Sequence, residues 1–165
     1  MAEPVSAAIG IGANLGDRRQ TIAEAVRAIG RISGVELDEV AEPVETEAVL
    51  LNEDAVPQPD FMNTVCVVQT TLTPRRLLGQ LQEIETSFGR PSVAERERWA
   101  PRVLDLDLLL YSGNTVDMRD LQVPHPRMTE RWFVLKPLAD IAPGWVVPGT
   151  GRTVTSWLSE VEQHA

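Results

Sequence analysis

Cysteine is almost absent from this chain of 165 residues: Cys66 is the only one, so no internal disulfide can form. No stretch approaches the roughly 20 apolar residues that a membrane-spanning helix needs. No basic flank followed by an apolar block opens the chain, and the signatures of a P-loop and of G-x-G-x-x-G are missing. These absences predict a cytoplasmic protein that does not bind a membrane. The length suits a single domain over residues 1–165.

Positive charge is also scarce. The formal net charge is −9 at pH 7, which argues against a protein that binds nucleic acid. The positive charge that is present is uneven, because four arginines fall between residues 90 and 102. Two of them, Arg98 and Arg102, lie close to Trp99, an arrangement that a solvated loop does not need. We therefore expect a local phosphate-binding segment, with a solvated loop as the alternative for Arg96.

The segment that follows Pro101 is the most informative part of the chain. Proline ends any preceding helix, and the apolar run from Val103 to Tyr111 predicts a strand whose side chains alternate between two faces. One face would carry Asp105 and Asp107 as next neighbours, which a core strand does not require. The other face would carry only leucines and therefore lie on a core: Leu104, Leu106, Leu108 and Leu110.

Two adjacent carboxylates need an explanation, since unit charges about 5 Å apart repel by roughly 1 kcal/mol in water and by several at a partly buried site. One interpretation is a Mg²⁺ site, in which one or two carboxylates share the ion with waters and phosphate oxygens. The other is a pair of solvated or arginine-paired aspartates at a sheet rim. The D-x-D pattern by itself favours this second interpretation, because the pattern is common. An EF-hand is excluded because Leu109 and Leu110 stand where that loop needs a ligand and a glycine.

The remaining pattern predicts alternating strands and helices. We expect strands over residues 5–12, 35–44, 61–70 and 145–147, and helices from Arg18 to Gly34, from Pro74 to a cap at Gly89, over 127–138 and over 155–161. Segments 45–60 and 89–100 are expected to be long loops, and residues 112–114 a hairpin turn with 115–118 returning along the preceding strand. This order is typical of an α+β, ferredoxin-like antiparallel sheet covered by helices, with the long loops over one end.

Several residues admit two interpretations. Asn63, at the start of an apolar strand, is either a satisfied edge residue or an amide that reads a ligand, and the sequence leans to the first. His125 between two prolines is more often a structural hydrogen-bonding residue than a catalyst. Gln82 and Glu85 lie off the apolar stripe of their helix and are most simply solvated. The small residues of the first strand, such as Gly10 and Gly12, suggest that something packs or binds closely against that face.

Four short motifs stand in an order that matches one known family. Residues 12–17 (G-A-N-L-G-D) are similar to G-S-N-L-G-D, and residues 59–63 (P-D-F-M-N) to P-D-[YF]-L-N. The most specific match is residues 98–107 (R-W-A-P-R-V-L-D-L-D), close to R-W-G-P-R-x-L-D-L-D. Residues 123–128 (V-P-H-P-R-M), with Arg131 and Phe133 after them, match V-P-H-P-R-x and R-x-F. The chain thus resembles, over nearly its whole length, the 6-hydroxymethyl-7,8-dihydropterin pyrophosphokinases of folate biosynthesis.

This resemblance implies transfer of a pyrophosphoryl group from ATP to the pterin's hydroxymethyl oxygen, with release of AMP. Asp105 and Asp107 would hold two Mg²⁺ ions that bridge the ATP phosphates, and Arg98 and Arg102 would complete the catalytic set. The residues implied to bind ATP are Gln82, Glu85, Arg98, Trp99, Arg102, His125 and Arg131. The residues implied to bind the pterin are Thr46, Phe61, Asn63, Asp105 and Phe133. The resemblance also implies a monomer whose partners are ATP and 6-hydroxymethyl-7,8-dihydropterin.

The chain departs from the family pattern at a few positions. Ala13 replaces a serine, Ala100 replaces a glycine and narrows backbone freedom there, and Val44 and Ala48 stand where an aromatic and a proline are frequent. Two alternatives remain. A nucleotidyltransferase with a D-x-D metal site usually places its aspartates much sooner after a Gly-Ser helix start. A non-catalytic ferredoxin-like binding module would explain the fold, but not two arginines beside two aspartates.

Overall fold

The computed structural model describes residues 3–14, 17–46, 61–88 and 104–163. Its centre is a five-stranded antiparallel sheet with the order β2-β4-β1-β5, in which β3 also pairs with β4. The strands are β1 (Val5–Ala13), β2 (Val35–Val40), β3 (Val44–Thr46), β4 (Phe61–Thr70) and β5 (Asp105–Tyr111). Two antiparallel ribbons are added by β6 (Val116–Met118) with β7 (Leu121–Val123), and by β8 (Val146–Val147) with β9 (Arg152–Thr153).

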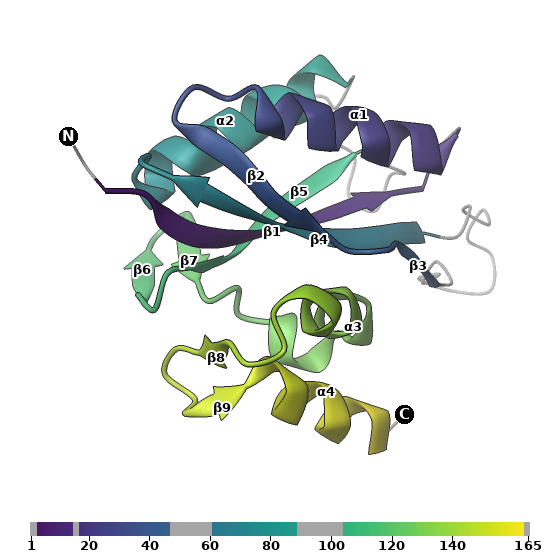
Figure 1. Cartoon of the computed structure of the whole chain (residues 1–165), viewed down its shortest axis with the longest axis vertical. Coiled ribbons are helices and arrows are strands. Elements are labelled where there is room, and N and C mark those ends of the chain that lie inside the picture. Colours follow the sequence, from purple (N-terminus) through teal and green to yellow (C-terminus); the bar gives the residue numbers. More distant parts are fainter. Residues whose placement is uncertain (1–2, 15–16, 47–60, 89–103, 164–165) are drawn as a thin grey trace.

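Helices cover both faces of the sheet (Figure 1). The helices α1 (Arg18–Gly30) and α2 (Pro74–Ser87) lie on one face, α3 (Trp132–Ile141) lies on the other, and α4 (Val154–Gln163) packs beyond α3. Because α1 connects β1 to β2 and α2 connects β4 to β5, the sheet is built from two split β-α-β units. The predicted α+β, ferredoxin-like architecture is confirmed. Within the described ranges, no helix is long and apolar enough to span a membrane.

A β-bulge in β5 corrects the prediction that its four leucines share one face. Leu110 pairs with Ala8 of β1 and Leu108 with Ile9, which leaves Leu109 as an extra residue between them. The leucines before the bulge join the apolar cluster under α1 and α2, whereas Leu109 and Leu110 both join the cluster under α3. The two aspartates precede the bulge and keep the predicted common face.

Both helix starts follow local signals in the sequence. Asp17 caps α1, since its Oδ1 accepts a hydrogen bond from the N–H of Gln20 at 3.1 Å. Thr73 caps α2 in the same way, accepting from the N–H of Arg76 at 3.3 Å, with Pro74 at the first helical position. These interactions span three residues, so a sequence pattern is enough to predict them.

Several predicted boundaries are wrong by a few residues. Helix α1 ends at Gly30, and Gly34 instead forms the turn into β2 with φ +88°. The strand predicted over 35–44 is divided between β2 and β3, and β3 extends to Thr46, inside the predicted loop 45–60. The rest of that loop, and the loop 89–100 with the cap at Gly89, lie outside the described residues.

Two segments of the C-terminal half also differ from prediction. The turn at 112–114 forms, but the segment after it pairs with β7 instead of returning along β5. The helix predicted over 127–138 is divided into a 3₁₀ turn, Met128–Glu130, and α3. The predicted strand 145–147 overlaps β8, and the predicted helix 155–161 lies within α4.

Cys66 lies in the middle of β4 and is 0 % exposed. Burial raises the pKa of its thiol to about 12. Since the thiolate is the reactive form, Cys66 is a core residue and not a nucleophile.

We predict that the folded protein is inert to a thiol reagent such as DTNB at pH 8. A pKa near 12 leaves about one thiol in 10⁴ ionised at that pH, and burial blocks access to it. After unfolding in guanidinium chloride, one equivalent should react within minutes. Rapid, stoichiometric labelling of the folded protein would contradict the buried position of Cys66.

Candidate functional site

Strand pairing brings polar residues of β4 and β5 into one row across β1. Gly12 of β1 pairs with Asn63 of β4 on one side and with Asp105 of β5 on the other. The next row on the same face has Asp107 opposite Gly10. Directly paired residues of an antiparallel sheet point to the same face. Asn63 and the two aspartates therefore share a face of the sheet, with only glycines between them.

Helix α3 covers part of this face. Its residues Val134 and Leu135 form an apolar cluster with Val65 of β4 and Leu109 of β5. The polar residues lie beyond that cluster, where the side chains are half-buried and not sealed in the core. We refer to this region as the site face and define it as Phe61, Asn63, Gly10, Gly12, Asp105 and Asp107.

Neighbouring side chains lie close to both glycines of β1 in the site face. A Cβ added at Gly12 would lie 2.8 Å from Oδ1 of Asn63, closer than such contacts allow. The Asn63 amide also donates a hydrogen bond from Nδ2 to Oγ1 of Thr46 at 3.4 Å. At Gly10 the Cβ position lies 3.4 Å from Cδ1 of Leu109. The predicted close packing against the small residues of β1 is thus confirmed.

The segment between β7 and the first turn of α3 adds cationic and aromatic groups to the site face. The N–H of His125 donates to the carbonyl oxygen of Leu109 in β5 at 3.0 Å, which fixes the loop against the strand. Arg131 and Phe133 stand at the start of α3, with the guanidinium carbon 5.7 Å from the ring centroid. Phe133 also packs against the apolar cluster under α3.

His125 is held as a neutral donor. Its Nδ1 accepts a hydrogen bond from the N–H of Arg127 at 3.3 Å, so the proton of the neutral ring is on Nε2. Burial lowers the pKa of His125, the positive charges of Arg131 and Arg127 lower it further, and the negative charge of Asp105 opposes them. Asp105 is thus among the charges that act on His125, whose loop is bound to β5.

The two α2 residues implied to bind ATP lie in different environments. Gln82 is exposed to solvent. Glu85, nearly one turn later, is only 5 % exposed, and its Oε2 accepts a hydrogen bond from the N–H of Leu106 at 2.8 Å. The solvated interpretation of Glu85 is therefore wrong. Its carboxylate contacts the backbone of the strand that carries the aspartates.

Asp105 and Asp107 present a donor set that suits Mg²⁺. They are separated by one residue on a strand, which spaces their Cα atoms by about 7 Å. Across the described ranges, no group of three or more His, Cys, Asp or Glu side chains could hold a metal ion by protein ligands alone. Mg²⁺ commonly accepts one or two carboxylates and completes its shell with waters and phosphate oxygens. The pair therefore fits an ion that arrives with a phosphate ligand.

The structure brings together most of the site residues that the sequence predicts. Those in the described ranges that gather at the site face are Thr46, Phe61, Asn63, Asp105, Asp107, His125, Arg131 and Phe133. Arg98, Trp99 and Arg102 lie outside the described residues, and their roles stay predictions. Sequence reasoning did not include Gly12 in the site, although the row of small residues in β1 was the signal that could have identified it.

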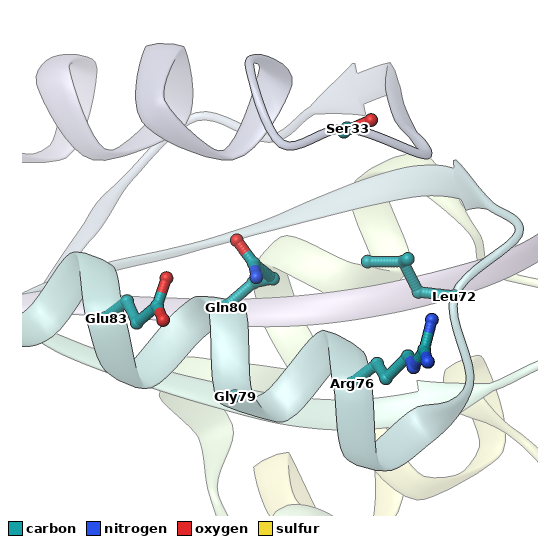
Figure 2. A pocket seen from close by; sticks show the side chains of 6 residues that line it. All are labelled: Ser33, Leu72, Arg76, Gly79, Gln80 and Glu83. Atoms are coloured by element: carbon teal, nitrogen blue, oxygen red, sulfur yellow. The ribbon is translucent and has the colours of Figure 1, made fainter.

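A separate hollow lies between the turn after α1 and the outer surface of α2 (Figure 2). Its volume is about 500 Å³, and it is lined by Ser33, Leu72, Arg76, Gly79, Gln80 and Glu83. It shares no residue with the site face and lies on the opposite side of the sheet from α3. We therefore do not include it in the functional site.

Sequence comparison identifies the family to which the chain is related. A family model described as 7,8-dihydro-6-hydroxymethylpterin-pyrophosphokinase (HPPK) matches residues 8–143. A 2-amino-4-hydroxy-6-hydroxymethyldihydropteridine pyrophosphokinase of Synechocystis is 35% identical over 156 residues, which cover 94% of this chain and 76% of that protein. A protein of the same name from Haemophilus influenzae is 33% identical over 162 residues, covering 97% of this chain and 95% of that one.

Solved structures show the same fold within longer chains. An HPPK-DHPS in complex with substrates has a TM-score of 0.71 at 15% identity, covering 98% of this chain and 44% of that chain. Wild-type HPPK-DHPS of Plasmodium falciparum with pterin and p-hydroxybenzoate has a TM-score of 0.73 at 12% identity, covering 99% of this chain and 44% of that chain. At such identities the likeness concerns the fold alone. The family model and the sequence relatives establish that the chain belongs to the 7,8-dihydro-6-hydroxymethylpterin-pyrophosphokinase family.

Proposed function

We propose that the site face is where this pyrophosphokinase of folate biosynthesis transfers a pyrophosphoryl group from ATP to 6-hydroxymethyl-7,8-dihydropterin. The products are the pterin diphosphate and AMP. The observation that carries the proposal is the row Asn63–Gly12–Asp105, which sets an amide and a carboxylate on either side of a glycine. Family membership identifies the reaction, and this row offers a place where its two substrates can meet.

The pterin would lie on the Asn63 side of the row. The polar edge of its rings carries both donors and acceptors, and a carboxamide can pair with both. Gly12 makes room for the Asn63 amide, because a Cβ at this position would lie 2.8 Å from its Oδ1. Phe61 and Phe133 provide aromatic surfaces against which such a ring can stack. The full set proposed for the pterin is Thr46, Phe61, Asn63, Asp105 and Phe133.

The phosphates would lie on the side of the aspartates. We propose that Asp105 and Asp107 hold two Mg²⁺ ions together with the phosphates of ATP. Bound Mg²⁺ would neutralise charge on the phosphate oxygens. The protein's contribution is position, because Asp105 belongs to the same row as Asn63 and therefore relates the phosphates to the pterin. Mutual repulsion of the two carboxylates favours binding of a cation between them.

ATP would be held around the aspartates by groups that donate hydrogen bonds or carry positive charge. The residues proposed to bind ATP within the described ranges are Gln82, Glu85, His125 and Arg131, and the arginine-rich segment would add Arg98, Trp99 and Arg102. The lowered pKa of His125 supports a neutral ring near pH 7 that donates through Nε2. Arg131 supplies a permanent charge with a planar array of donors, which matches phosphate oxygens.

In the transfer, the hydroxymethyl oxygen forms a bond to the β-phosphorus of ATP. The bond between that phosphorus and the bridging oxygen of AMP breaks, its electron pair stays with AMP, and the hydroxyl loses its proton. Reactions of this type require little covalent chemistry from a protein. Positioning of the two substrates and stabilisation of the charge on the leaving AMP would provide most of the rate enhancement.

We predict that Asp105→Asn and Asp107→Asn each lower pterin-dependent AMP formation by more than about 100-fold. Each substitution removes a proposed metal ligand, and in metal sites the loss of a group that only orients a ligand already lowers affinity or activity by about 10–100-fold. The measurement is chromatography of adenine nucleotides after incubation with ATP, MgCl₂ and the pterin. Asp117→Asn is the matched control, since Asp117 is exposed on β6.

Thermal unfolding of both variants should stay close to that of the parent. An active Asp105→Asn, Asp107→Asn double variant would contradict the role of the pair. Formation of ADP in place of AMP would show ordinary phosphoryl transfer. Pterin binding without any nucleotide turnover would favour a binding module.

We predict that Gly12→Ala raises the KM for the pterin about tenfold or more. The new Cβ would lie 2.8 Å from Oδ1 of Asn63 and would therefore displace that side chain. Stability should fall by only about 1 kcal/mol, since the clash is with the end of a side chain that can rotate away. Steady-state AMP formation against pterin concentration measures the first effect, and thermal unfolding the second.

The control for this variant is Gly79→Ala, a helical glycine with nothing within 4 Å of its Cβ position. That change should leave the KM unaltered. A normal pterin KM in Gly12→Ala would place the pterin away from β1.

A further inference from the structure

We propose that Glu85 is a positioning residue that holds the strand of the two aspartates in place. The inference rests on the proposed function, because it concerns the site at which Asp105 and Asp107 act. The carboxylate of Glu85 is 5 % exposed, and its Oε2 lies 2.8 Å from the backbone nitrogen of Leu106, the residue between the two aspartates.

The position of β5 in the sheet explains why such a contact is needed. β5 is the last strand in the order β2-β4-β1-β5, so no other described strand pairs with its outer edge. A backbone N–H on that edge would otherwise need water or a neighbouring chain. The Leu106 N–H donates instead to a side chain from α2. Helix α2 thus acts as the neighbour that the edge strand lacks.

Leu106 is consequently fixed on three sides. Its side chain is 4 % exposed and lies in the apolar cluster under α1 and α2. Its strand partner is Ile11 of β1, which is 2 % exposed. Its N–H is bound by Glu85 on the remaining side. Asp105 and Asp107 flank this residue directly, so the orientation of Leu106 determines where both carboxylates leave the strand.

A carboxylate is a costly acceptor to bury, and a hydrogen bond to a charged acceptor is shorter and about twice as strong as a neutral one. The Glu85 contact fixes the backbone of the residue that stands between the two aspartates. In metal sites, loss of a group that orients a ligand typically lowers affinity or activity by about 10–100-fold.

Three substitutions separate this role from the alternatives. Glu85→Ala removes the hydrogen-bond acceptor. Glu85→Asp keeps the charge, but its side chain is one methylene shorter and holds the carboxylate farther from the strand. Glu85→Gln removes the charge but keeps an oxygen that can accept a hydrogen bond from the Leu106 N–H. Glu83→Gln and Glu83→Ala are the matched controls, because Glu83 is exposed on the same helix.

The first readout is amide hydrogen exchange by NMR, which needs no reaction. We expect the Leu106 amide to exchange about tenfold faster or more in Glu85→Ala and Glu85→Asp, and close to the parent rate in Glu85→Gln. The Val68 amide, in the central strand β4, reports global stability and should change far less. A merely structural role of Glu85 would raise the exchange of both amides together.

The second readout is Mn²⁺ affinity by electron paramagnetic resonance, with a non-hydrolysable ATP analogue present. We expect binding about 10–100-fold weaker in Glu85→Ala and Glu85→Asp, with near-parent values in Glu85→Gln and in both Glu83 variants. If Glu85→Ala does not fold, the comparison of Glu85→Asp with Glu85→Gln decides the question.

Two results would overturn the proposal. One is an unchanged Leu106 amide in Glu85→Ala or Glu85→Asp. The other is a reversed order, with Glu85→Asp like the parent and Glu85→Gln as defective as Glu85→Ala, since the charge alone would then matter. A parent protein that forms no pterin-dependent AMP would instead refute the proposed function, while amide exchange would still test the contact with Leu106.

Discussion

The pairing of β1 with both β4 and β5 is the constraint on which the site depends. This register places Asn63, Gly12 and Asp105 in one row, although more than forty residues of the chain separate Asn63 from Asp105. A slip of one residue in either ladder would turn the polar side chains toward the opposite face. Glycine at the middle of the row is equally necessary, because a Cβ there would lie 2.8 Å from Asn63 Oδ1.

The two faces of the sheet serve different purposes. The face under α1 and α2 is an apolar core that includes Ile9, Ile29 and Leu77, each 0 % exposed. The other face is apolar only where α3 covers it, and the polar residues lie beyond that cover. Burial on the first face stabilises the sheet, so that the second can present two neighbouring carboxylates.

The sequence predicted those features that depend on nearby residues. The helix starts at Arg18 and Pro74, the strand limits of β4 and the alternation of the two aspartates all follow from patterns a few residues long. Features that depend on distant partners were missed. The bulge at Leu109 exists only relative to β1, and the burial of Glu85 follows from how α2 lies along β5. The motifs gathered at the site were identified by family resemblance, since D-x-D or a lone Asn is ambiguous alone.

The central claim is that one row of paired residues brings the pterin and the phosphates together. The most direct test is a crystal structure with Mg²⁺, a non-reactive ATP analogue and 6-hydroxymethyl-7,8-dihydropterin. Our account predicts the pterin over Gly12 with its polar edge on Asn63, and metal ions on Asp105 and Asp107 that bridge the phosphates. A pterin bound elsewhere, or phosphates away from both aspartates, would contradict it.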